Sequence, residues 1–271
     1  MSAVKKNYVV ETLRKAQMVE LLAKGKRVDG RSQDEMRALK IETRLIEKAN
    51  GSAKVSLGNT QVIAGVKVAT GTPFADTPDK GVLMVNAEVL PLASPYAEAG
   101  PPDENAIELA RVVDRGVRES EMVDLSKLVL IAGKSVYTVF VDVNILNVDG
   151  NLFDATSYAV VSALRTAKIP KFEADGDKVT NTGKLMPLPV QKTPVSVTMA
   201  RIGSIIVVDP TAEEEAVMDA RITLTTDDED NICAGQKGEP GTFTPAQVME
   251  AAEKAIRKGR ELRSVIKEAS G

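Results

Sequence analysis

Histidine and tryptophan are absent from the 271-residue chain, and Cys233 is its only cysteine. The absence of histidine excludes Ser-His-Asp triads, Cys-His dyads and the HExxH zinc motif. A single cysteine excludes an internal disulfide bond and a cysteine-based zinc ribbon. Any catalysis would therefore depend on carboxylate, lysine, arginine, serine or tyrosine side chains, and we expect neither a bound metal nor a cofactor.

Membrane and dinucleotide signatures are also missing. No apolar run reaches the roughly 18 residues needed to span a bilayer, and the N-terminus lacks the pattern of a signal peptide. With the single cysteine, this predicts a cytoplasmic protein. No GxGxxG fingerprint occurs. The tetrapeptide Ala132-Gly133-Lys134-Ser135 resembles the end of a phosphate loop, but a strand-like segment follows where a helix is required, so it is interpreted as a hairpin turn.

The charge pattern is uneven along the chain. The formal net charge of −3 gives no overall signature of nucleic-acid binding. Residues 1–27 nevertheless carry seven lysines and arginines against two glutamates. An amphipathic helix is expected over 3–24, and its charge fits either a solvated face or a contact with nucleic acid or an acidic partner.

The hydrophobic pattern predicts an α+β fold of two similar halves, each with strands followed by helices. Expected strands lie at 38–46, 53–57, 61–68, 82–90, 128–131 and 135–148, with a loop at 92–102, a helix capped by Asp103, and a buried helix at 153–167. A four-strand meander over 195–234 and a final helix from Thr244 follow. The expected organisation is an N-terminal helix at 1–26, a first half at 27–170, a crossover at 171–193 and a second half at 194–271.

The helix after the loop carries Arg111, Arg115 and Arg118 at positions i, i+4 and i+7. This spacing places all three on one stripe of the helix. A row of guanidinium groups is suited to consecutive phosphates, because each group can donate hydrogen bonds to two oxygens at once. The alternative is pairing within the helix, between Glu108 and Arg111 and between Asp114 and Arg118.

Several segments occur in the order typical of a known family. They are the R-x-D-G-R motif in Gly25–Arg31, the hairpin turn Gly58-Asn59-Thr60, the helix ELARVVDRGVRES at 108–120, the strand–Asp-Gly–helix passage at 141–167, and TMARIGSIIVVDPT at 198–211. Together they cover roughly 20–270. The chain thus resembles the RNase PH family, the phosphorolytic 3′-to-5′ exoribonucleases.

The resemblance implies an RNase PH-like fold, related to ribosomal protein S5 domain 2, and a six-membered ring. In the archaeal RNA exosome, three catalytic family members alternate with three of the type that this chain resembles. The implied partners are therefore a catalytic RNase PH-like subunit, RNA-binding cap proteins and single-stranded RNA, with no membrane.

The chain departs from active family members at two places. The start of the helix after the loop reads Pro101-Pro102-Asp103-Glu104-Asn105, whose two carboxylates would repel a phosphate dianion. The family's pair of aspartates, six residues apart, is matched to Gly203 and Asp209, and glycine can neither donate a proton nor hold a cation through a side chain.

These departures predict a non-catalytic ring subunit with no catalytic residues of its own. It would shape the active site of its partner and bind RNA phosphates through Arg111, Arg115 and Arg118. The alternative is an active phosphate-dependent exoribonuclease that uses Asp209 and another carboxylate such as Asp219. A third possibility is a scaffold without RNA contact.

The remaining polar features have structural interpretations. Arg27 and Arg31 are expected to form ion pairs that fix the turn between the first helix and the first strand. The acidic run Asp227-Asp228-Glu229-Asp230 is expected to be a solvated hairpin tip, because it lacks the ligand spacing of a calcium loop. Cys233 is expected to be a small core or edge residue.

Overall fold

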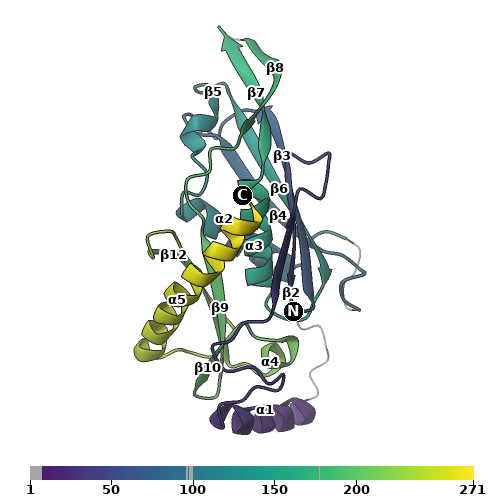
Figure 1. Cartoon of the computed structure of the whole chain (residues 1–271), viewed down its shortest axis with the longest axis vertical. Helices are drawn as coiled ribbons and strands as arrows, with labels where there is room; N and C mark the ends of the chain where they lie inside the picture. The colour runs from purple at the N-terminus through teal and green to yellow at the C-terminus, as the bar shows by residue number, and fades with distance from the viewer. Residues whose placement is uncertain (1–7, 96, 98–99, 177) are drawn as a thin grey trace.

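The computed structural model describes residues 8–95, 97, 100–176 and 178–271. The described helices are α1 (Tyr8–Ala23), α2 (Glu104–Glu119), α3 (Leu152–Arg165), α4 (Ala212–Val217) and α5 (Pro245–Ala269), with a 3₁₀ turn at Leu125–Leu128. The strands are β1 (Leu39–Thr43), β2 (Gly51–Leu57), β3 (Thr60–Gly71), β4 (Val82–Val89), β5 (Val129–Ile131), β6 (Ser135–Asn147), β7 (Lys168–Asp175), β8 (Lys178–Pro187), β9 (Val195–Ile202), β10 (Ile205–Val208), β11 (Ala220–Thr226) and β12 (Ile232–Gly238). The molecule is elongated, with the β7–β8 hairpin at one end and α1 at the other (Figure 1).

The larger sheet belongs to the first half of the chain. Its strands run in the order β1-β2-β3-β6-β4, with β5 paired to β6, and β4 is parallel to β6 while the other pairs are antiparallel. Buried residues alternate along β2 and β3, as expected for strands with one face on the core. Gly51 in β2 allows α3 to approach, since an added Cβ would collide with the backbone carbonyl of Ala163 in that helix and would lie 2.8 Å from the Cα of Ala167 just after it.

The smaller sheet belongs to the second half, and its order differs from the expected meander. The order is β10-β9-β11-β12, so β11 pairs with β9 and not with β10. The reason is α4, which replaces the start of the strand expected from Val217. A capping box between Thr211 and Glu214 starts this helix. The helix carries the chain from the end of β10 to the other edge of β9.

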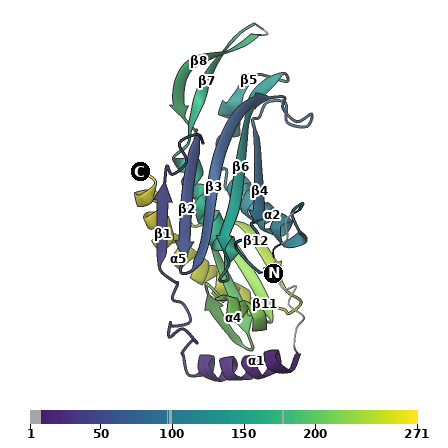
Figure 2. The ribbon, with the colours of Figure 1, turned by 90° about the vertical axis from the view of Figure 1, so that its right-hand side faces the viewer.

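Helix α3 lies between the two sheets and is buried from Leu152 to Leu164. It contacts β2 and β3 of the larger sheet and β9 of the smaller one. The hydroxyl of Tyr158 donates a hydrogen bond of 2.8 Å to the carbonyl of Ser196 in β9, which satisfies a polar group inside the core. Helix α5 packs against β9 and β11 of the smaller sheet. Figures 1 and 2 show this helix from two sides. The two halves therefore share one core.

The segment expected as a crossover at 171–193 contains a hairpin instead. Strands β7 and β8 pair over 168–187 and extend beyond the larger sheet (Figures 1 and 2). Gly176, at a φ of 59°, lies in the turn. The base of the hairpin is held by Tyr137 of β6, whose hydroxyl accepts a hydrogen bond of 2.9 Å from the backbone N–H of Phe172 and whose ring meets that of Phe172 edge-on. The chain therefore forms this hairpin first and reaches β9 of the second half only after β8.

The N-terminal helix packs on the smaller sheet and α4. Met18 and Leu22 are buried against Ile202, Val207 and Val217. Lys15 of this helix pairs with Asp219, and Lys24, in the turn that follows the helix, pairs with Glu20. The predicted helix is confirmed from Tyr8 onward, and its expected start at 3–7 lies outside the described residues, as do residues 96 and 98–99 of the expected loop.

Candidate functional site

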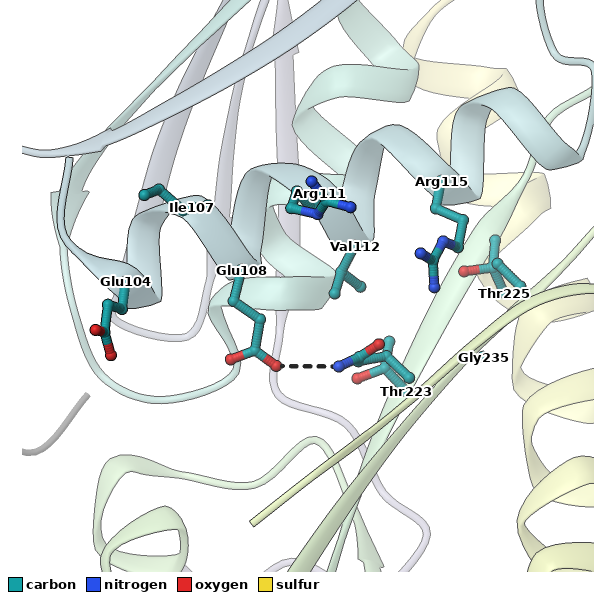
Figure 3. Close-up of a pocket in the computed structure, with 11 residues that line it drawn as sticks. Glu104, Ile107, Glu108, Arg111, Val112, Arg115, Thr223, Thr225 and Gly235 are labelled. Atoms are coloured by element: carbon teal, nitrogen blue, oxygen red, sulfur yellow. Dashed lines mark hydrogen bonds between the residues drawn. The ribbon is translucent and has the colours of Figure 1, made fainter.

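A pocket of about 290 Å³ opens between α2 and the strands β11 and β12 (Figure 3). Its helical wall and its strand wall come from different halves of the chain. The lining residues are Glu104, Ile107, Glu108, Arg111, Val112 and Arg115 of α2, Thr223 and Thr225 of β11, and Ala234, Gly235 and Gln236 of β12.

Helix α2 holds two of the predicted arginines over this pocket. Asp103 caps the helix by accepting a hydrogen bond of 2.8 Å from the backbone N–H of Ala106. Its apolar face, with Leu109 among others, is buried, so the opposite face is turned outward. Arg111 and Arg115 lie one turn apart on the exposed side (Figure 3). Neither forms a hydrogen bond or ion pair with a described residue, so both guanidinium groups are available to an anion.

Arg118 differs from the other two arginines. Its guanidinium donates hydrogen bonds of 3.0 and 2.8 Å to Asp114, and one of 2.9 Å to the carbonyl of Leu83 in β4. It does not line the pocket. The structure therefore brings Arg111 and Arg115 together at the pocket, whereas Arg118 contacts β4. Arg118 also forms the pair with Asp114 that the sequence offered as an alternative.

The other alternative, a pair between Glu108 and Arg111, does not form. Glu108 accepts a hydrogen bond of 2.8 Å from Nη2 of Arg221, which lies on β11. Gln236 of β12 adds a contact of 3.4 Å to the same carboxylate oxygen, marked in Figure 3. Sequence reasoning missed Arg221 and Gln236, because more than a hundred residues separate each from Glu108 and no local pattern connects them.

The strand wall of the pocket leads into a buried polar network. The hydroxyl of Thr223 lies 2.9 Å from that of Thr198 in β9, which donates a hydrogen bond of 2.7 Å to Asp154 of α3. Asp154 also accepts from Asn151, the N-cap of α3. Burial raises the pKa of Asp154 to about 7, against the hydrogen bonds from Asn151 and Thr198 that lower it. A chain of two hydroxyls thus joins the pocket to a buried acid.

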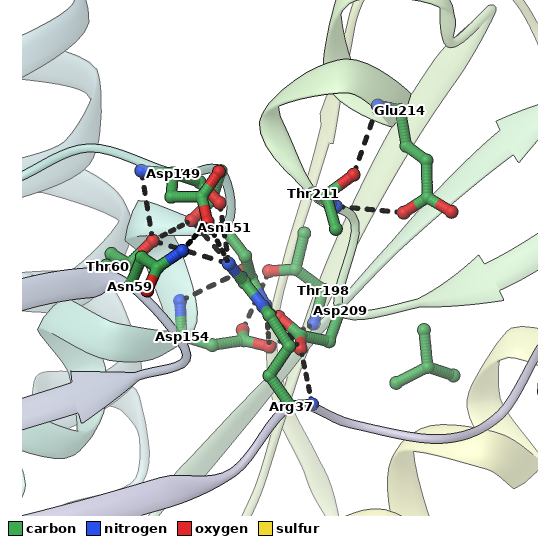
Figure 4. A network of polar contacts seen from close by, with 12 residues as sticks. Arg37, Asn59, Thr60, Asp149, Asn151, Asp154, Thr198, Asp209, Thr211 and Glu214 are labelled. Atoms are coloured by element: carbon green, nitrogen blue, oxygen red, sulfur yellow. Dashed lines mark hydrogen bonds and ion pairs between the residues drawn. The ribbon is translucent and has the colours of Figure 1, made fainter. Parts of the chain in front are cut away.

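Asp209 is fully buried. It lies among the polar contacts of this network in Figure 4. It accepts hydrogen bonds from the Arg37 guanidinium at 2.7 and 2.9 Å, from Arg31 at 3.0 Å and from Asn151 at 2.7 Å. Burial alone would raise the pKa of Asp209, but the hydrogen bonds and charge of Arg37 outweigh it and hold the pKa below its ordinary value of 3.8. Asp209 therefore acts as a structural anion for arginines.

The structure does not bring Gly203 and Asp209 together. Gly203 lies in the turn before β10, with a φ of 63°, and Asp209 follows β10. A four-residue strand separates them, which corresponds to about 13 Å. The side-chain direction from Gly203 leads toward Val19 of α1. An aspartate at 203 would therefore not share a site with Asp209, which counts against the expected match of these positions to the family's catalytic pair.

A backbone N–H group at the start of α3 already donates a hydrogen bond to a carboxylate of the same chain. Glu215 of α4 accepts a hydrogen bond of 2.8 Å from the backbone N–H of Asn151. Burial raises the pKa of Glu215 above its ordinary value of 4.5, against that hydrogen bond and the charges of Arg221 and Arg37. The N-terminal end of a helix favours a negative group, and here Glu215 fills that role.

The structural interpretation of Arg27 and Arg31 is confirmed. Arg27 is buried and pairs with Glu214, to which its Nε donates at 2.8 Å. Arg31 pairs with Asp29 and Asp209. These contacts tie the turn after α1 to α4 and to the end of β10.

The acidic run is a hairpin tip, but it is not simply solvated. Asp227 is buried and accepts hydrogen bonds from Lys192 and Asn231, which lower its pKa to about 2 although burial works in the opposite direction. Asp228 pairs with Lys267, and Asp230 pairs with Arg260. The run thus attaches the β11–β12 hairpin to α5, because basic side chains of that helix lie alongside it.

The described residues contain no cluster of three or more potential metal ligands. No described helix is long and apolar enough to cross a membrane. Cys233 is half-buried on β12, and burial raises the pKa of its thiol. These features match its expected place as an edge residue.

Comparisons with known proteins extend over most of the chain. Residues 35–170 match a model described as 3′ exoribonuclease family, domain 1, and residues 192–258 match domain 2. The exosome complex component Rrp42 of Thermococcus gammatolerans is 53% identical over 256 residues, which are 94% of each chain. That of Thermoplasma acidophilum is 48% identical over 97% of this chain and 95% of its own length.

Solved structures agree with these matches. A chain of the Archaeoglobus fulgidus exosome with RNA bound to the active site is 46% identical and superposes with a TM-score of 0.86, covering 94% of this chain and 98% of its own length. Rice Rrp46 superposes with a TM-score of 0.70 at 16% identity and shows the fold alone. The expected RNase PH-like fold is therefore confirmed. This chain belongs to the RNase PH family of 3′ exoribonucleases.

Proposed function

We propose that the chain is a non-catalytic subunit of an archaeal RNA exosome ring and that it binds RNA phosphates through Arg111 and Arg115. The observation that carries this proposal is the pair of exposed guanidinium groups, one turn apart over a pocket, that have no partner among the described residues. Guanidinium groups in this arrangement suit neighbouring phosphates of a single strand. Relatives named as exosome components, and a similar chain in an exosome with bound RNA, support the setting.

The proposed partners are a catalytic member of the same family, which alternates with this chain in a six-membered ring, and cap proteins that bind RNA. The chain would complete the active site of its neighbour and work in a reducing cytoplasm, which suits its single free cysteine. Phosphate contacts position RNA without reading its bases, so we expect little sequence preference.

Three features support the absence of catalysis by this chain. The start of α2 presents Asp103 and Glu104, where a phosphate would meet negative charge. Asp209 is held by two arginines and is not free to act as an acid. Glu215 occupies the backbone N–H of Asn151, at the helix end that would otherwise favour an incoming anion.

The test is RNA shortening by this chain alone and by a ring reconstituted with its catalytic homologue, each with and without inorganic phosphate. We expect shortening only from the ring and only with phosphate. Release of nucleoside diphosphates by the chain alone would instead support the alternative, an active phosphorolytic exoribonuclease.

The RNA-binding claim is tested in the ring by the double substitution Arg111→Ala, Arg115→Ala. With about 1 kcal/mol for each exposed contact, the affinity for single-stranded RNA should fall about thirtyfold. The salt dependence should also become shallower, because fewer counterions are released. Arg118→Ala, on the same helix but already paired with Asp114, is the matched control. Equal effects of the two changes, or none from the double substitution, would refute the assignment.

A further inference from the structure

Glu108 creates an electrostatic problem for the pocket. It lies one turn before Arg111 on α2, at the i, i+3 spacing where opposite charges pair readily. An unrestrained Glu108 carboxylate would neutralise Arg111 and repel a phosphate in the same pocket. In the structure the carboxylate is turned away from Arg111 and toward β11, where Arg221 binds it at 2.8 Å.

Arg221 is held firmly in the position that makes this contact. Its side chain is 9% exposed. Its guanidinium carbon lies 4.1 Å from the centre of the Phe153 ring, a cation–π contact with the start of α3. On β12, Gly238 is its cross-strand neighbour. A Cβ at Gly238 would lie 2.5 Å from Nη2 of Arg221, so the missing side chain leaves the space that the guanidinium uses.

Arg221 does not itself line the pocket. Side chains alternate along a strand, so Arg221, Thr223 and Thr225 share the face of β11 that is turned toward α2. The guanidinium therefore reaches the pocket only through Glu108. Glu108 is the pocket-lining residue that Arg221 contacts, so an effect of Arg221 on a pocket ligand can act through that carboxylate.

We infer that Arg221 is a positioning residue for RNA binding: by holding Glu108 it leaves Arg111 unpaired and neutralises the carboxylate beside the phosphate position. The inference rests on the proposed function of Arg111 and Arg115. Loss of Arg221 should therefore lower the affinity for RNA only while Glu108 carries a charge.

The experiment measures the affinity of the reconstituted ring for a short, fluorescently labelled oligoadenylate by anisotropy at low salt. The variants are Arg221→Gln, Glu108→Gln, and the two combined. Gly238→Ala displaces the guanidinium without removing its charge, so it tests the same contact if Arg221→Gln fails to fold. The control is Arg201→Gln on β9: Arg201 opposes Ala220, so it lies on the other face of the sheet from Arg221, and its partner is Asp219.

We expect Arg221→Gln to weaken RNA binding about threefold. The released Glu108 would then pair with Arg111, and an exposed ion pair of this kind changes an affinity by about that factor. Gly238→Ala should act in the same direction. Adding Glu108→Gln to either variant should restore the affinity, which a merely structural role of Arg221 would not allow. Arg201→Gln should leave the affinity unchanged.

Two results would overturn the inference. One is normal binding by both Arg221→Gln and Gly238→Ala; the other is failure of Glu108→Gln to rescue either of them. The Arg111→Ala, Arg115→Ala ring is measured in the same assay. If that ring binds normally, the proposed function fails and this inference fails with it. If it binds weakly while the Arg221 and Gly238 variants bind normally, only this inference is refuted.

Discussion

Replacing Asp209 with asparagine removes the central charge of the buried network while keeping the size of the side chain. Asp209 has a φ of 52°, in the left-handed region that asparagine also tolerates, so backbone strain adds little. The carboxylate is paired with Arg37 and Arg31, whose side chains are 8% and 10% exposed. In the variant both guanidinium groups lose this anion.

The expected cost follows from what each arginine keeps. Removing one partner of a buried ion pair costs about 3–5 kcal/mol, because the other charge stays buried. Arg37 still donates to the carbonyls of Asp149 and Gly150, and Arg31 still pairs with Asp29. We therefore expect a loss at the lower end of that range, about 3 kcal/mol in the free energy of unfolding. This loss corresponds to a decrease of about 6–12 °C in Tm.

The assay is urea unfolding followed by circular dichroism, for the wild type, Asp209→Asn and the control Asp149→Asn. Asp149 is 34% exposed and lies 3.9 Å from Arg37, so its replacement should cost less than about 1 kcal/mol.

The pH dependence gives a second check on the same residue. Because the folded-state pKa of Asp209 is lowered, its contribution is present above the ordinary pKa of 3.8 and is lost as the pH falls through the folded-state pKa. The difference between wild type and Asp209→Asn should therefore narrow in acid. A difference below about 1 kcal/mol at neutral pH, or one that is constant with pH, would refute the role of Asp209 as a structural anion.

Two further changes test the core around α3. The pKa of Asp154 is raised to about 7, so the folded state binds more protons than the unfolded state between pH values near 4 and 7, and stability should decline as the pH rises through that range. Asp154→Asn should flatten this decline in urea unfolding measured across pH, and an unchanged slope would contradict the assignment. Gly51→Ala places a methyl group against the Ala163 carbonyl of α3 and should cost about 1–3 kcal/mol. Gly65→Ala, whose added Cβ would lie 3.9 Å from its nearest neighbour, is the thermal-unfolding control, and equal Tm shifts would refute the close-packing argument.

Local sequence determined most of the secondary structure. The caps at Asp103 and Thr244 start α2 and α5, because their side chains satisfy free N–H groups of the first turn. The alternation along β2 and β3 predicted strands with one buried face. The 3.6-residue period of α2 also placed Arg111 and Arg115 on one outward face. These features depend on neighbours only a few residues apart, which a sequence displays directly.

Partner choice between distant segments was decided only in the tertiary structure. The sequence offered Arg111 as a partner for Glu108, but the fold supplies Arg221, because β11 passes beside α2. The strand order could not be predicted from the local pattern either. A six-residue helix, α4, connects β10 to β11, and β11 therefore pairs with the edge of β9 opposite to β10. Asp209 became a buried anion for the same reason: chain segments far apart in sequence bring Arg31 and Arg37 to it. Ion pairs and register depend on three-dimensional proximity, and that proximity is set by the packing of the whole core.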